Sequence, residues 1–155
     1  MAHYSFLTLW RIQAPLPAVW NAIHDVERWP TWWRGVERVL KLEPALEEND
    51  VGSRYSLTWK GRLPYRLTFE SRVTRVIPLV AIESKATGDL EGTGRWQLLE
   101  EGSVTTVRYD WNVRTTKSWM NLLVPVGRAL FQWNHDWIMR QGEKGLGRIL
   151  SLAVR

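Results

Sequence analysis

The hydrophobic period along the chain restricts the fold more than any other feature of the sequence. Residues 65–74 (YRLTFESRVT) and 107–114 (VRYDWNVR) place apolar or small side chains at every second position, with polar or charged side chains between them. In a β-strand, successive side chains point to opposite faces of the sheet. The alternation therefore predicts antiparallel strands with one buried face and one face in water.

Further runs of the same kind, separated by turn signals that contain glycine, complete a predicted sheet. In the first of them, Phe6, Thr8, Trp10 and Ile12 share one face. The sequence predicts seven strands, at residues 4–12, 36–43, 53–60, 64–76, 79–87, 93–100 and 103–115.

Two short helices are expected between the first and second strands. Residues 17–25 (PAVWNAIHD) begin with a proline, which suits a first helical turn. Their apolar side chains Val19, Trp20 and Ile23 form a stripe at helical spacing. Residues 29–35 (WPTWWRG) predict another short turn or helix, which ends at its glycine.

The last part of the chain, residues 118–151, predicts one long helix. Ser118 suits its N-cap, and Pro125 either kinks the helix or marks its effective start. A seven-stranded antiparallel sheet has one apolar face, and no other element is long enough to cover it. We therefore expect an α+β fold in which the sheet curls around the C-terminal helix. The apolar positions that step by three or four along this helix are Trp119, Leu123, Val126, Leu130, Trp133 and Trp137.

Composition excludes several classes of protein. The chain has no cysteine, which rules out disulfides and thiolate metal sites. It has no apolar run of about 20 residues and no cationic start with a cleavage site, so we expect a cytoplasmic protein. The net charge of +5 lies mostly in the C-terminal segment, without the dense patch of a nucleic-acid binder. No repeat or linker divides residues 1–155, so a single domain is expected.

Three segments carry a resemblance to a known family. They are residues 12–23 (IQAPLPAVWNAI), residues 25–33 (DVERWPTWW) and residues 133–142 (WNHDWIMRQG). Together with the order of the elements, they resemble the START-domain and polyketide cyclase/dehydrase (SRPBCC) superfamily, which has the helix-grip fold. The resemblance covers essentially the whole chain. It implies a cavity between the sheet and the long helix that holds a lipid, a polyketide or another apolar molecule.

The aromatic content agrees with such a cavity. The chain has eleven tryptophans, and rings occupy many inward positions of the predicted strands. The simpler alternative is that these rings only fill the core. Ligand pockets are mostly apolar with a few placed polar groups, and Tyr and Trp supply both. The residues predicted to contact a ligand are Trp10, Trp33, Tyr55, Trp59, Tyr65, Phe69, Trp96, Tyr109, Trp111 and His135.

Two functions fit these features. The first is a binding or carrier protein for a small apolar molecule, without a metal or organic cofactor. The second is an enzyme that resembles a polyketide cyclase or aromatase, in which the cavity folds a reactive chain. The three histidines lack the spacing of a zinc site, and neither a GxSxG elbow nor a glycine-rich phosphate loop occurs.

The most distinctive polar cluster is Asn134, His135 and Asp136, within the apolar last helix. Neighbours on a helix point about 100° apart, so at most two of the three face inward. In one interpretation His135 binds ligand or transfers a proton. In the other, which we favour, Asn134 and Asp136 tie the helix to other parts of the fold.

Three further hypotheses concern access to the cavity. The tryptophans within residues 29–33 either plug the core or form an aromatic mouth in which Trp32 and Trp33 gate entry. Residues 140–155 are predicted to loosen and admit ligand, because glycine weakens a helix interior. A basic ridge at four-residue spacing is either a solvated face or a contact with an anionic membrane. The glycines are Gly142, Gly145 and Gly147, and the ridge is Arg140, Lys144 and Arg148.

Overall fold

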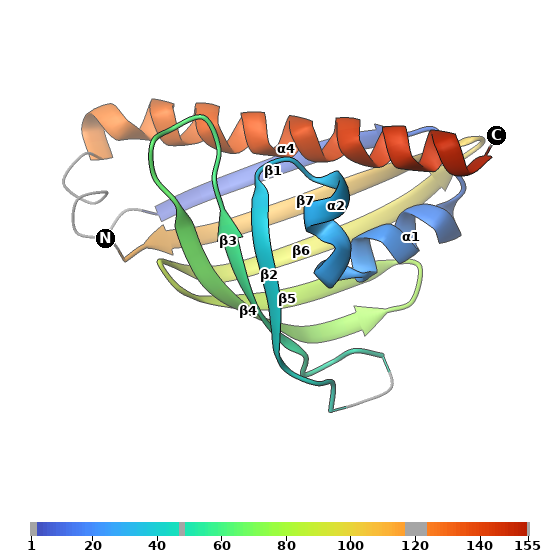
Figure 1. Ribbon diagram of the computed structural model, residues 1–155, viewed down its shortest axis with the longest axis horizontal. Helices are drawn as coiled ribbons and strands as arrows, with labels where there is room; N and C mark the ends of the chain where they lie inside the picture. Colours follow the sequence, from blue (N-terminus) through green and yellow to red (C-terminus); the bar gives the residue numbers. More distant parts are fainter. Residues whose placement is uncertain (1–2, 47–48, 117–123, 155) are drawn as a thin grey trace.

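Seven strands form one antiparallel sheet that curls around a long C-terminal helix (Figure 1). The computed structural model describes residues 3–46, 49–116 and 124–154. The predicted fold class is confirmed. The elements in chain order are β1 (His3–Ile12), α1 (Leu16–His24), η1 (Val26–Arg28), α2 (Trp29–Trp32), β2 (Val36–Glu43), β3 (Arg54–Trp59), β4 (Leu67–Ile77), β5 (Ala81–Gly88), β6 (Leu90–Glu101), β7 (Val104–Thr115) and α4 (Val124–Val154).

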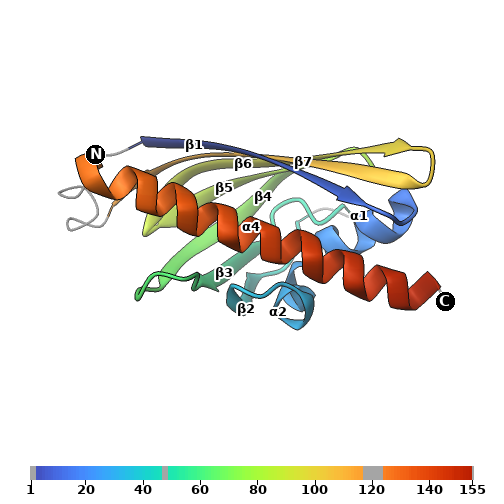
Figure 2. The same cartoon turned by 90° about the horizontal axis from the view of Figure 1, so that it is seen from above.

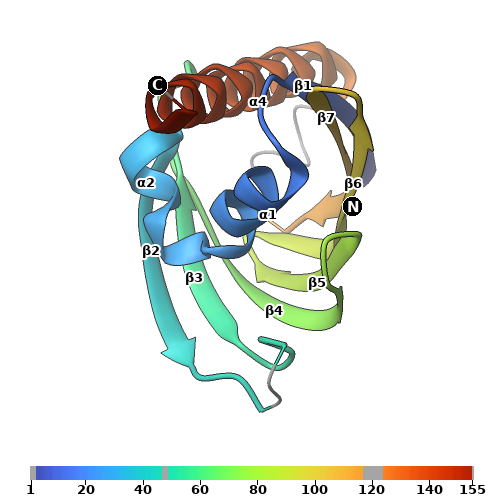
Figure 3. The same cartoon turned by 90° about the vertical axis from the view of Figure 1, so that its right-hand side faces the viewer.

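The strand order brings the two ends of the chain together. The order is β1-β7-β6-β5-β4-β3-β2, so the first strand pairs with the last and the remaining neighbours are consecutive in sequence. Seen along the sheet, the strands wrap from β1 round to β2, and α4 lies over the gap between these two edges (Figure 3). From above, α4 crosses the sheet obliquely (Figure 2). The concave face of the sheet and the inner side of α4 therefore enclose the core.

The predicted alternation is confirmed in the strands. On β7, Val107, Trp111 and Val113 are buried, whereas Arg108 and Asn112 between them are exposed. The pattern follows because each strand has one face toward the core and one toward water. In β4 the pairing with β5 shifts register after Val73, and the bulge adds to the bend of the sheet.

The two short helices and the turn between them fill one end of the curled sheet. The predicted stripe of α1, made of Val19, Trp20 and Ile23, is buried. Pro17 lies in the first turn of α1, as expected. In α2, Trp29 and Trp32 are buried as well.

The predicted long helix is confirmed from Val124 onward, but the face predicted from its apolar residues is wrong. Leu130 is 49% exposed and Trp133 is 46% exposed, and both lie on the outer side of α4. The inner side carries Phe131, Ile138 and Leu146 instead. No helix in the described ranges is long and apolar enough to cross a membrane. Pro125 lies in the first described turn of α4, whereas Ser118, Trp119, Leu123 and the side chain of Val126 lie outside the described part of the chain.

Candidate ligand-binding site

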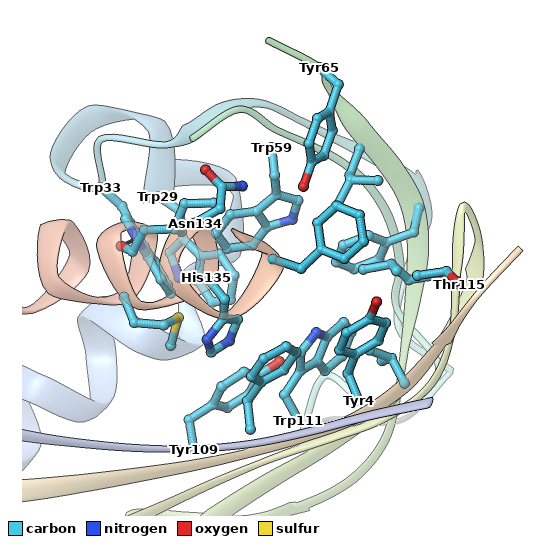
Figure 4. A pocket seen from close by; sticks show the side chains of 18 of the residues that line it. Tyr4, Trp29, Trp33, Trp59, Tyr65, Tyr109, Trp111, Thr115, Asn134 and His135 are labelled. Atoms are coloured by element: carbon cyan, nitrogen blue, oxygen red, sulfur yellow. Dashed lines mark hydrogen bonds between the residues drawn. The ribbon is translucent and has the colours of Figure 1, made fainter. Parts of the chain in front are cut away.

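A cavity of about 100 Å³ lies between the concave face of the sheet and α4 (Figure 4). The sheet supplies one wall from β1, β3, β4, β6 and β7, and α4 supplies another with residues between Phe131 and Met139. Trp29, the first residue of α2, and Trp33, which follows its last residue, complete the lining between the sheet and α4. For scale, an engineered apolar cavity of about 150 Å³ binds benzene. The space therefore suits a compact ring or a short apolar chain.

Most residues that the sequence predicted to contact a ligand meet at this cavity. The exceptions are Tyr55, which lines a second cavity of about 40 Å³, and Trp10, which lines neither. Trp10 is packed with its ring centroid 5.1 Å from that of Trp33 and 5.4 Å from that of Trp96. The expectation that Trp10 lines the cavity is therefore wrong, because its ring is enclosed by core tryptophans. The predicted residues that line the cavity are Trp33, Trp59, Tyr65, Phe69, Trp96, Tyr109, Trp111 and His135.

Sequence reasoning missed several residues of the walls. Tyr4 and Phe6 lie on the same face of β1 as Trp10, so the strand alternation contained the signal for both. Phe131 and Met139 come from the inner side of α4. They were missed because the prediction placed the opposite side of the helix, with Leu130 and Trp133, toward the core.

Asn134 joins α4 to the loop between β3 and β4. Its side chain is buried, and its Oδ1 accepts hydrogen bonds from the backbone N–H groups of Arg62 (2.7 Å) and Leu63 (3.2 Å). The structural interpretation of Asn134 is therefore correct. Asp136 does not share this role, because it is exposed and accepts a hydrogen bond from Gln132 on the same helix.

Replacing Asn134 with Ala is expected to lower the free energy of unfolding by about 2 kcal/mol, because two backbone N–H groups lose their acceptor. Thermal or urea unfolding measures this change. The matched variant His135→Ala removes a neighbouring side chain with no such bonds, so it should alter ligand release more than stability. A larger loss of stability in His135→Ala than in Asn134→Ala would contradict the structural role of Asn134.

His135 presents a neutral imidazole to the cavity. Its ring stacks on Phe6 with the centroids 4.0 Å apart. Within the described chain, neither ring nitrogen has a hydrogen-bond partner, and the Asp136 carboxylate is 3.7 Å from Nδ1. Burial lowers the pKa of His135 to about 4, against the opposing effect of the Asp136 charge. At neutral pH the ring can therefore both donate and accept a hydrogen bond.

Other polar atoms also point into the cavity. The Tyr4 hydroxyl and the Trp59 indole N–H are buried and have no hydrogen-bond partner in the described part of the molecule. Burial raises the pKa of Tyr65 to about 12, so its phenol stays protonated. These donors lie on different sides of the space in Figure 4, with the Tyr4 and Tyr65 hydroxyls directed toward it from opposite walls. Buried polar groups are normally hydrogen-bonded, so the unpartnered ones indicate water or a ligand.

The tryptophans of residues 29–33 belong to the core. Trp33 is 1% exposed, and its indole N–H donates a 2.8 Å hydrogen bond to the backbone oxygen of Ile138 in α4. The indole N–H of Trp29 donates to the oxygen of Ile23 at 3.1 Å. The hypothesis of an aromatic mouth gated by Trp32 and Trp33 is therefore wrong, because both rings are buried where α2 meets α4.

The glycines near the end of α4 allow close packing. A Cβ at Gly142 would lie 2.6 Å from ring atoms of both Trp10 and Trp33. A Cβ at Gly145 would collide with the backbone oxygen of Trp32. α4 continues through both positions without interruption. The hinge hypothesis for residues 140–155 therefore loses its basis, and Gly142→Ala cannot test it, since that position has no room for a methyl group.

The site as a whole is suited to binding. Its walls are mostly aromatic rings and aliphatic side chains, and among the described residues no Asp, Glu, Lys or Arg lines it. Its ionisable groups are His135, whose pKa is low, and tyrosines whose pKa values burial raises. Such a site holds an apolar molecule and offers it a few hydrogen bonds.

Comparisons with known proteins agree with this geometry. Residues 12–138 match a family model described as "Polyketide cyclase / dehydrase and lipid transport". Among curated proteins, none matches the chain in sequence.

Solved structures show the same fold at low sequence identity. A START superfamily protein from Mycobacterium smegmatis has a TM-score of 0.77 at 13% identity, over 98% of this chain and 99% of that one. The Zhui aromatase/cyclase from Streptomyces sp. R1128 has a TM-score of 0.75 at 14% identity, over 99% and 97%. A protein from Thermus thermophilus has a TM-score of 0.74 at 19% identity, over 92% and 97%.

Proposed function

Because the chain belongs to the polyketide cyclase/dehydrase and lipid transport family, we propose that it binds and carries a small, largely apolar molecule in the cavity under α4. A compact aromatic molecule fits the volume of the cavity best. In this proposal, residues 1–155 act as one ligand-binding domain. The family contains both binding proteins and enzymes of polyketide chemistry, so the site itself has to support the choice.

The observation that carries the proposal is the composition of the cavity wall. Aromatic rings surround a space of about 100 Å³, and the described residues that line it include few polar groups and no charged side chain. Apolar surface buried in such a space contributes about 25 cal/mol per Å² to binding. Tyr4, Trp59 and His135 add hydrogen-bonding groups without partners of their own in the described chain. These groups favour a ring that carries an oxygen or nitrogen substituent.

Native mass spectrometry of the gently purified protein tests the proposal directly. We expect an added mass that denaturation removes. With the empty protein, quenching of the wall tryptophans by a single-ring aromatic quencher such as nitrobenzene should saturate. A protein that retains no molecule and shows no saturable quenching would contradict the proposal.

Filling the cavity should weaken binding without altering the fold. Val113 lines the cavity from β7, so Val113→Phe would place a ring in the space and lower the affinity for nitrobenzene at least tenfold. The matched control is Asn112→Phe, the next residue on β7, whose side chain lies on the outer face. Equal affinities of the two variants in a fluorescence titration would mean that the probe binds elsewhere.

An enzymatic role is the second candidate, and the neutral imidazole of His135 favours it. A neutral histidine can take a proton, and buried tyrosines with raised pKa values keep theirs for hydrogen bonding. Holding a flexible chain in a reactive conformation accelerates cyclisation even with few catalytic groups. The test is the rate at which a synthetic poly-β-ketone cyclises with the native protein and with His135→Phe. Equal rates with and without protein would exclude this candidate.

The outer side of α4 offers a contact with an anionic membrane. Arg140, Lys144 and Arg148 are exposed, and none forms an ion pair with a described residue. They continue the stripe of the exposed residues Leu130 and Trp133. Tryptophan is enriched at membrane–water interfaces. Each basic side chain contributes about 1 kcal/mol near an anionic surface. We propose that this side of α4 docks on such a surface when ligand is loaded or delivered.

Replacing Arg140, Lys144 and Arg148 together with Ala is expected to weaken binding to phosphatidylglycerol vesicles about 100-fold, as measured by flotation. The matched control replaces Arg38, Arg75 and Lys85 with Ala. These residues are exposed on other parts of the surface, and their replacement lowers the net charge by the same amount. Equal weakening by both triple variants would show that only net charge matters.

A further inference from the structure

A second cavity of about 40 Å³ lies on the far side of the aromatic wall, under α1 and η1. The two cavities are neighbours through shared walls. Tyr109 lines both, and Gly94 leaves room for it, since a Cβ there would lie 2.7 Å from the Tyr109 hydroxyl oxygen. The residues common to both cavities are Trp29, Trp59, Phe69, Trp96, Tyr109 and Trp111.

Unlike the first cavity, the second has a carboxylate in its wall. The side chain of Asp50 is 15% exposed. Its Oδ1 accepts a 2.5 Å hydrogen bond from the Ser53 hydroxyl, and its Oδ2 accepts a 3.1 Å hydrogen bond from the Tyr55 hydroxyl. The His24 Nε2 lies 4.0 Å from Oδ2. A carboxylate has about four acceptor positions, so Asp50 can accept further hydrogen bonds.

The part of the sheet that walls the second cavity carries two serines. Ser71 on β4 pairs with Tyr55 on β3, and Ser84 on β5 pairs with Gly94 on β6. Both line the cavity. Neither hydroxyl forms a hydrogen bond with another described residue. The pairing of the strands does not require a hydroxyl at either position, and water or a ligand would satisfy both.

We propose that the second cavity binds the polar end of the ligand, a hydroxyl or a protonated amine, while the apolar body occupies the first cavity. This inference rests on the proposed binding function. The preferred ligand is therefore an elongated amphiphile with an aromatic or apolar body and a hydrogen-bond donor at one end. Asp50 accepts from the donor, and the hydroxyls of Ser71 and Ser84 line the same cavity from the sheet.

The aromatic partition between the cavities is consistent with such a ligand. Within it, the ring centroids of Trp59 and Phe69 are 6.3 Å apart, and those of Tyr109 and Trp111 are 5.9 Å apart. Both pairs are stacked, with interplanar angles of 9° and 20°. An alkyl chain is narrower than a ring, so it would displace these packed rings less than a second ring would. The link between the two ends of the ligand should therefore be aliphatic.

The test uses three series of probes with two to eight linking carbons, namely ω-phenylalkanols, ω-phenylalkylamines and phenylalkanes of the same length. Affinities are measured by calorimetry or tryptophan quenching. At the length that spans the partition, the alcohol and the amine should bind at least tenfold more tightly than the alkane. At shorter lengths the three should bind alike.

Two variants of Asp50 identify the acceptor. Asp50 has a left-handed backbone with φ 69°, which both Asn and Gly tolerate. Asp50→Asn keeps an oxygen acceptor without the charge, so the advantage of the amine should fall tenfold while that of the alcohol remains. Asp50→Gly removes the acceptor, so both advantages should disappear while the phenylalkanes bind as before. Ser71→Ala with Ser84→Ala tests the two serine hydroxyls and should reduce the advantage of the alcohol.

The outcomes separate this inference from the proposed function. Phenylalkanes that bind, with no advantage for alcohol or amine at any length, would overturn the second site and leave the function intact. An advantage that persists in Asp50→Gly would also overturn it. Failure of every probe to bind, phenylalkanes included, would overturn the proposed function itself.

Discussion

Acidification from pH 7 to pH 4 is expected to lower the free energy of unfolding of the native chain by about 3 kcal/mol more than that of a His135→Phe variant. The cause is the burial of His135 against Phe6, which lowers its pKa to about 4 in the folded protein. An exposed histidine of the unfolded chain has a pKa of about 6.5.

The sign follows from which state binds the proton. As the pH falls through 6.5, the unfolded chain takes up a proton at His135, and the folded protein does not until the pH approaches 4. Stability is therefore fully present above about pH 6.5 and is lost between there and about pH 4. The Asp136 carboxylate opposes this loss by raising the pKa. It does not prevail, because it lies 3.7 Å from the ring and its side chain is 51% exposed.

The variant isolates one histidine from the other groups that titrate. Phe keeps a flat ring that can stack on Phe6 and removes the titration. Carboxylates such as Glu43, whose pKa is lowered by hydrogen bonds from Arg72 and Arg54, also reduce stability in acid, but they do so equally in both proteins. Urea unfolding at half-unit steps of pH gives the difference. Parallel curves for the two proteins would mean that His135 is accessible to water.

The sheet was predictable from the sequence because one physical constraint repeats along it. Each strand has a core face and a water face, so the alternation of apolar and polar side chains in β7 (Val104–Thr115) shows which of them are buried. The predicted strands match the observed ones to within a few residues. The inward direction of cavity residues such as Tyr109 and Trp111 follows from that alternation, whereas the cavity itself was implied by the family resemblance.

The inner face of α4 was not predictable in the same way, for an identifiable reason. Its inner positions include Asn134, His135, Gly142 and Gly145, which are polar or lack a side chain. The prediction from hydrophobic periodicity therefore chose the face that contains Leu130 and Trp133, which lie on the outer side. A helix that walls a cavity and packs closely on another helix does not need a continuous apolar stripe.

The cluster around Asp50 illustrates a second limit. His24 at the end of α1 and Asp50 before β3 meet only because the short helices cap the sheet near the turn that contains Asp50. No local spacing connects them. Sequence patterns report the environment of an element, whereas a site assembled from several loops depends on how the elements pack.

The packing of α4 against α2 leads to the second large effect that we expect. Gly145→Ala should lower the free energy of unfolding by about 3 kcal/mol, near the upper end for overpacking. The obstacle is the backbone oxygen of Trp32, which cannot turn aside as a flexible side chain can. In a protein of this size such a loss corresponds to a melting temperature lower by roughly 10 °C.

Gly147, two residues further along the same helix, provides the matched control. A Cβ there would meet no atom within 4 Å. Gly147→Ala should therefore raise stability by up to about 1 kcal/mol, since alanine is the better helix former. Calorimetry of the two variants should give shifts of opposite sign. If residues 140–155 were a hinge, both alanines would stiffen the helix and both would stabilise it, so a positive shift for Gly145→Ala would refute close packing of α4 on α2 and restore the hinge.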